Sequence, residues 1–255
     1  MPSIKKESFG KLADGRVATV YTLRNTKGNE LKVTDYGAKV VSMRFRNKDF
    51  ANKFMFKSYS EVGGFENDDA AGMVFVDGGT EFGKIFWQAE EIIEGVKFSA
   101  ELDGKKIAIT YSISNDNEIS VIYETEGVQD ISAQFIFDGE VLPDAKISAF
   151  AEGASETKIS GSQTYSLIDK PAEVEMELGM FGYDPGCPID YLDAGLKNAA
   201  DIVSDAASIG VKVYATQNKL HVEEVAGGFA VKTEESNPKD GKIKSQTVYV
   251  LKNRK

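Results

Sequence analysis

The chain has 255 residues, of which 42% are hydrophobic and 10% aromatic, and this composition can form a buried core and argues against an intrinsically disordered protein. Forty acidic and thirty basic residues give a formal net charge of -10, which would repel phosphates and anionic lipids, so neither nucleic acid nor a membrane is expected as a partner. A single cysteine, Cys187, excludes an intrachain disulfide framework, and the N-terminus lacks the apolar run of a signal peptide, so we expect a cytoplasmic protein.

Alternation of apolar and polar residues predicts β-strands along almost the whole chain. In the first third of the chain it covers Arg16 to Arg24, Glu30 to Thr34 and Ala38 to Phe45. It returns from Val96 to Leu102, where Asp103-Gly104 follows and suits a tight hairpin turn because both residues tolerate positive φ angles.

The alternation continues after this turn. It runs through residues 107–113, ends at the turn-forming segment Asn115-Asp116-Asn117 and resumes at Ile119. Further strands are expected at Ile131 to Phe137, Val211 to Thr216, Lys219 to Glu224, Phe229 to Thr233 and Ser245 to Leu251. Only Leu196 to Ala207 has a helix-like composition, and we predict a helix there. Short strands separated by Gly, Asn and Asp predict an all-β antiparallel sandwich, and since no linker or repeat divides the chain, residues 1–255 are expected to form one domain.

Several segments of the sequence resemble aldose 1-epimerases (galactose mutarotases). The matching segments are Glu7 to Arg16, Tyr21 to Asn25, Thr34 to Ala38, Asp77 to Thr80 with Trp87, Tyr214 to Leu220, Gly227 to Ala230 and Thr247 to Tyr249. The resemblance implies a large antiparallel β-sandwich of the galactose mutarotase-like (supersandwich) type with an open sugar-binding groove. A shared fold does not carry the chemistry unless the site residues are present.

Mutarotation requires a base that takes the proton from the anomeric hydroxyl and an acid that protonates the ring oxygen. In the family a histidine on a central strand is the acid and a glutamate near the C-terminus is the base. The resemblance places Gln134 at the acid position and Lys232 at the base position. Neither residue can take over its role unchanged, because glutamine does not titrate and lysine is a cation. We therefore expect no catalytic residue of the family type.

The family's sugar-binding residues are also replaced or displaced. Asp77 stands where a histidine precedes the double glycine, and it is either a sugar-contacting carboxylate or a turn residue. The arginine-bearing segment is expected to be deleted, because the path from Tyr59 to Asp77 is too short to contain it. For the family's aspartate, Asp190 is preferred over Asp184. Lys232 and Glu234 share one strand face, which either lines a groove or is a solvated side of the sandwich. The candidate ligand-binding residues are thus Asp77, Gln134, Asp190, Lys232 and Glu234.

Other chemistry-bearing residues have simpler interpretations. His221 is the only histidine and is expected to be a surface imidazole on the strand face that also carries Glu223. Trp87 is expected in the core. The acidic segment 66–69 lacks the spacing of a calcium loop, so neither a metal nor a cofactor is expected.

Three hypotheses follow. The first is a mutarotase-like protein without the acid-base pair that binds a carbohydrate or another small polar ligand in a remodelled groove. The second is an active aldose 1-epimerase in which carboxylates such as Asp77 or Glu234 and the amine of Lys232 transfer the protons. The third is a structural or protein-interaction role with a closed groove.

Overall fold

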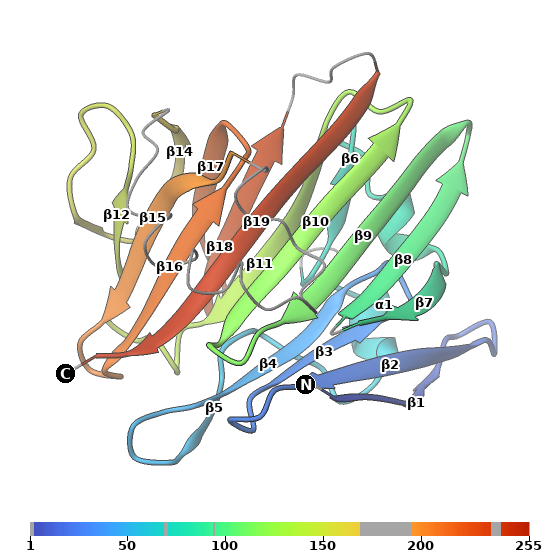
Figure 1. Cartoon of the computed structure of the whole chain (residues 1–255), viewed down its shortest axis with the longest axis horizontal. Helices are drawn as coiled ribbons and strands as arrows, with labels where there is room; N and C mark the ends of the chain where they lie inside the picture. The colour runs from blue at the N-terminus through green and yellow to red at the C-terminus, as the bar shows by residue number, and fades with distance from the viewer. Residues whose placement is uncertain (1–2, 69–70, 94, 169–194, 236–240, 255) are drawn as a thin grey trace.

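The computed structural model describes residues 3–68, 71–93, 95–168, 195–235 and 241–254, which form three antiparallel sheets (Figure 1). The N-terminal sheet contains β1 (Ser3–Lys11), β2 (Val17–Arg24), β3 (Glu30–Thr34), β4 (Val40–Arg46) and β5 (Asn52–Phe54), in that order. The nine-stranded sheet contains β7 (Gln88–Ile92), β8 (Gly95–Leu102), β9 (Lys105–Ile113), β10 (Glu118–Glu126), β12 (Lys146–Ala149), β13 (Thr157–Lys158), β15 (Lys197–Ser204), β16 (Ile209–Ala215) and β19 (Lys242–Asn253), in the order β13-β12-β15-β16-β19-β10-β9-β8-β7.

The third sheet has the strand order β14-β17-β18-β11-β6. Its strands are β6 (Val74–Val76), β11 (Ile131–Asp138), β14 (Ser162–Ser166), β17 (Lys219–Val225) and β18 (Gly228–Glu235). The short helix α1 (Val62–Glu66) and the 3-10 helix η1 (Glu81–Lys84) precede and follow β6. Among the described residues, no helix has the length and apolar character needed to cross a membrane.

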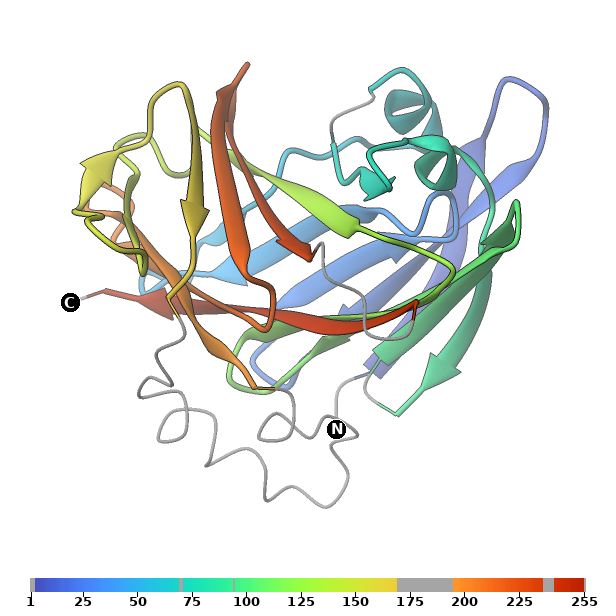
Figure 2. The same cartoon turned by 90° about the horizontal axis from the view of Figure 1, so that it is seen from above.

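Both smaller sheets pack on the same face of the nine-stranded sheet (Figures 1 and 2). Tyr21 of β2 meets Phe98 of β8 edge-on with ring centroids 5.6 Å apart, and Phe135 of β11 lies 4.9 Å from Tyr249 of β19. Burying a side chain of the size of Phe98 contributes roughly 1.5–3 kcal/mol. One hydrophobic cluster contains residues of all three sheets, so the molecule is a large antiparallel β-sandwich, and the predicted fold class is confirmed.

The hairpin between β8 and β9 has the predicted turn. Asp103 and Gly104 have φ angles of 52° and 76°, and the strands pair from Leu102 opposite Lys105 onward. Such two-residue turns match the twist of the flanking strands, which explains why so short a signal suffices to locate the hairpin. Trp87 is also where the sequence predicts it, since it is only 4% exposed and its indole N–H donates to the Phe82 carbonyl at 2.8 Å.

The helix predicted at Leu196 to Ala207 is wrong, because Lys197–Ser204 is strand β15. The alanines give this segment a helical composition, but Ala199, Ala200 and Ile202 are buried between neighbouring elements. β15 pairs with β12 on one side and β16 on the other, so both backbone edges are hydrogen-bonded within the sheet. Pairing of this kind outweighs a propensity difference of about 0.7 kcal/mol per residue.

Candidate functional site

The third sheet turns one face toward the core and the other away from it. On β11 and β18, Phe135 and Val231 are buried in the core cluster, and strand alternation places Gln134 and Lys232 on the opposite face. This outer face is the candidate site, because it carries both positions to which the resemblance assigns the acid and the base.

Four polar residues form a straight row across this face, one from each of four adjacent strands. Thr164 of β14 pairs with His221 of β17, His221 with Lys232 of β18, and Lys232 with Gln134 of β11. Because neighbouring strands are about 4.8 Å apart, this polar row spans ~14 Å. The two positions to which the resemblance assigns the family's acid and base are thus direct neighbours.

Glu234 lies next to the polar row on the same strand as Lys232. The amine Nζ of Lys232 is 3.6 Å from Oε2 of Glu234, and Nζ of Lys219 is 3.6 Å from Oε1. Lys232 also lies over the ring of Phe75, with Nζ 5.4 Å from the centroid. The carboxylate of Glu234 therefore holds two lysines in place, and Lys232 and Glu234 line the same face as the sequence predicts.

Asp130 precedes β11 and interacts electrostatically with Glu234 and Lys232. The sequence does not identify it as a site residue. Burial, followed by the negative charge of Glu234, raises the pKa of Asp130 to about 6, and the charge of Lys232 offsets part of that increase. The Oδ1 atom of Asp130 is buried and has no hydrogen-bond partner among the described residues. The sequence signal that could have found it is alternation, because Asp130 precedes Gln134 by four positions and an even offset keeps two residues on one face of a strand.

Asp77 has the contacts of a turn residue. Its φ is 50°, and its Oδ1 accepts backbone hydrogen bonds from Gln129 at 2.8 Å and Asp130 at 2.9 Å. Its Oδ2 lies 2.7 Å from Nζ of Lys105. Burial by itself would raise the pKa of Asp77, but the hydrogen bonds from Lys105 and the two amides outweigh it and lower the pKa. Asp77 thus lies near Asp130, but its carboxylate already accepts from three donors.

His221 is less exposed than expected for a surface imidazole. Its side chain is 24% exposed, and Nδ1 lies 2.8 Å from Oγ1 of Thr164, while Nε2 is 3.8 Å from the carboxylate of Glu223. The predicted sharing of one face with Glu223 is correct, and the same face also carries Lys232. The hydroxyl residues Ser162, Thr164 and Ser166 alternate along β14, which is the sequence signal that could have predicted this part of the row.

A second group of side chains borders the row beyond β11. Phe56 bridges to Phe137 in the core, so the next residue, Lys57, lies on the outer face, and its amide donates to the Ile136 carbonyl at 2.8 Å. Nζ of Lys57 is 3.0 Å from Oδ2 of Asp68, which also accepts from the Tyr59 hydroxyl. The hydrogen bond that each of them donates to Asp68 raises the pKa of Lys57 and of Tyr59. The site face is therefore flanked by a lysine that Asp68 holds in position.

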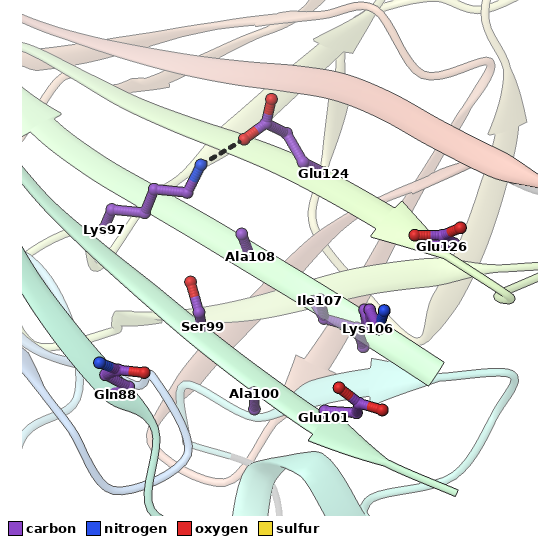
Figure 3. A pocket seen from close by; sticks show the side chains of 10 residues that line it. All are labelled: Gln88, Lys97, Ser99, Ala100, Glu101, Lys106, Ile107, Ala108, Glu124 and Glu126. Atoms are coloured by element: carbon purple, nitrogen blue, oxygen red, sulfur yellow. Dashed lines mark hydrogen bonds and ion pairs between the residues drawn. The ribbon is translucent and has the colours of Figure 1, made fainter. Parts of the chain in front are cut away.

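A different hollow of about 460 Å³ lies on the outer face of β7 to β10 (Figure 3). Lys97 of β8 and Glu124 of β10 reach toward each other across β9, where Ala108 leaves room between them, and their charged atoms are 2.8 Å apart. None of the predicted site residues lines this hollow. Asp190 and Cys187 lie outside the described residues. Within the described part of the chain no three His, Cys, Asp or Glu side chains converge as metal ligands would.

Comparison by sequence finds no matching family model and no matching curated protein. Comparison by structure does find proteins of similar fold. A galactose 1-epimerase from Lactobacillus acidophilus NCFM superposes with a TM-score of 0.69 at 12% identity, and a GalM/aldose epimerase homologue from C. elegans with 0.67 at 11%; each alignment covers 100% of both chains. A galactose mutarotase related enzyme from Lactobacillus acidophilus gives 0.58 at 9% identity over 92% of this chain and 97% of that one. The chain therefore has the fold of these galactose mutarotase and aldose epimerase homologues.

Proposed function

We propose that this protein uses the outer face of the third sheet to bind a carbohydrate or another small polar ligand and does not catalyse mutarotation by the family's mechanism. The observation that carries the proposal is the direct pairing of Gln134 with Lys232. An amide and an ammonium group stand at the two positions where the resemblance implies the acid and the base. Together they can orient hydroxyl groups, but the amide cannot exchange a proton with the ring oxygen.

The neighbouring groups support ligand binding. The row also offers an imidazole at His221 and a hydroxyl at Thr164, and Glu234 adds a carboxylate beside it, so one face carries hydrogen-bond donors and acceptors across ~14 Å. A carboxylate that holds both Lys219 and Lys232 keeps these amines oriented before a ligand arrives. Such preorganisation lowers the ordering cost of binding.

Polarimetry on freshly dissolved glucose and galactose tests the absence of catalysis. We expect the anomers to equilibrate at the spontaneous rate in the presence of the protein. Acceleration that disappears in Gln134→Ala or Lys232→Ala would contradict the proposal. Binding is tested separately with methyl glycosides, which cannot mutarotate: Lys232→Ala should weaken their binding on this face at least ~5-fold, with Lys244→Ala on the nine-stranded sheet as control.

Asp130 favours a second candidate function, an epimerase with a different acid-base pair. A carboxyl group with a pKa of about 6 is suited to proton transfer near neutral pH, and Glu234 close by is a second carboxylate. This candidate requires catalysed anomer exchange that is lost in Asp130→Asn and retained in Gln134→Ala. The first proposal requires no catalysed exchange in either variant, so one set of measurements separates the two.

A further inference from the structure

A cavity of about 530 Å³ lies on the N-terminal sheet, on the face turned away from the nine-stranded sheet. Its floor is apolar and consists of Phe9, Val20 and Val41, which are 7%, 6% and 3% exposed. Its wall is the segment 58–60, and Phe54 of β5 stands at the margin with 53% of its surface exposed. The volume lies within the roughly 300–1,000 Å³ typical of small-molecule sites.

The wall of the cavity is fixed by contacts on both sides of it. The Lys57 amide is bonded to β11, and the Tyr59 ring packs edge-on against Phe65 with centroids 4.9 Å apart. The Tyr59 hydroxyl donates to Asp68. These contacts hold the segment in place without occupying the cavity, so the cavity is preformed and a ligand does not have to order its wall.

The polar groups of the cavity are largely uncommitted. Across the described part of the chain, the hydroxyls of Ser42, Ser58 and Ser60 form no side-chain hydrogen bond, and the amine of Lys32 forms no ion pair. Glu7 also lines the cavity; its Oε1 is 2.8 Å from Nζ of Lys5, and it keeps a second carboxylate oxygen. Glu7 and Lys32 give the lining one charge of each sign, which favours a neutral ligand over an ionic one.

We infer that this cavity binds a neutral hexose unit and is a second site, separate from the polar row. An exposed aromatic ring at the margin, an apolar floor and several open hydroxyls match a molecule that has both apolar ring faces and many hydroxyl groups. The cavity shares no residue with the polar row, so the inference does not depend on the function proposed for that face.

Titration of the isotope-labelled full chain with methyl β-D-glucopyranoside and methyl β-D-galactopyranoside, followed by amide NMR, tests the inference. At least one glycoside should shift the amides of Ser42, Ser58 and Ser60 in a saturable manner. Phe54→Ala should weaken this binding at least ~10-fold, because the exposed ring is the largest apolar contact at the margin. Phe50→Ala is the matched control, since Phe50 is 74% exposed and does not line the cavity.

The outcomes distinguish this site from the polar row. Lys232→Ala should leave the shifts at Ser58 and Ser60 unchanged even where it abolishes shifts around Gln134. Absence of saturable shifts at the cavity with both glycosides would overturn the inference, and so would shifts that persist with full affinity in Phe54→Ala. Loss of the cavity shifts in Lys232→Ala would show that the two regions form one site and would likewise overturn it.

Discussion

Gln134 of β11 lies directly opposite Lys232 of β18, and the same register continues to Phe137 opposite Phe229 and Asp138 opposite Gly228. Phe137 and Phe229 stack with centroids 5.2 Å apart and an interplanar angle of 8°. The positions of Gln134 and Lys232 therefore depend on how closely β11 and β18 approach each other where Asp138 pairs with Gly228. Four predictions follow from this arrangement and from the charges around it.

Gly228→Ala should destabilise the fold and disturb the polar row. A Cβ at this position would lie 1.9 Å from the Phe137 carbonyl oxygen, so β11 and β18 would have to separate. We expect a loss of ~2–4 kcal/mol in the free energy of unfolding, measured by urea denaturation. Gly63→Ala is the control, because nothing lies within 4 Å of its added Cβ and alanine favours the helix. Equal stability of the two variants would contradict the close approach.

Asp130→Asn should stabilise the protein at high pH. A carboxyl group whose pKa is raised by folding binds its proton more tightly in the folded chain than in the unfolded chain. The free energy of unfolding therefore falls as the pH rises from 3.8, the ordinary pKa of an aspartate, through about 6, the pKa of Asp130 in the folded protein. Partial solvent exposure reduces the effect, so removing this charge should raise the free energy of unfolding by about 1 kcal/mol at pH 7.5 and by much less at pH 4.5. Urea unfolding at both pH values measures the difference. Asp49→Asn, at an exposed position, is the control.

Lys232→Met should raise the pKa of Asp130 further. Lys232 is the larger of the two lysine influences that oppose the increase, and Lys219 is the smaller. NMR titration of the Asp130 carboxyl carbon should therefore place its pKa above 6 in Lys232→Met and closer to the wild-type value in Lys219→Met. An unchanged titration in Lys232→Met would mean that the two groups do not interact.

Asp77→Ala should destabilise the turn between β6 and η1. The substitution removes the acceptor of the Gln129 and Asp130 amides and the partner of Lys105, and it places alanine at a φ of 50°. We expect a loss of ~2–3 kcal/mol in the free energy of unfolding. Asp14→Ala is a suitable comparison, because Asp14 makes similar bonds to Arg16 in an exposed turn and should matter far less. Comparable losses at the two positions would argue against a special role for Asp77.

The sequence predicts the faces of the strands better than it predicts which strands are neighbours. Alternation alone puts Gln134 on the face opposite Phe135, and Lys232 on the face opposite Val231. That the two residues meet depends on the pairing of β11 with β18, which is a tertiary property with no local signal. The same limit explains β15, where pairing with β12 and β16 overrides an alanine-rich composition. The sequence does not predict the raised pKa of Asp130, because the increase arises from burial and from the charge of Glu234 on another strand.

Since each member of the polar row comes from a different strand, the backbone ladder and the chemistry of the face can change independently. Replacing Gln134 or Lys232 exchanges a functional group while the core-facing neighbours Phe135 and Val231 keep their packing. Inserting a single residue within β18 would instead invert the strand and direct a charge into the core. Proteins with this fold should therefore diverge at these positions by substitution, and insertions and deletions should be confined to the loops.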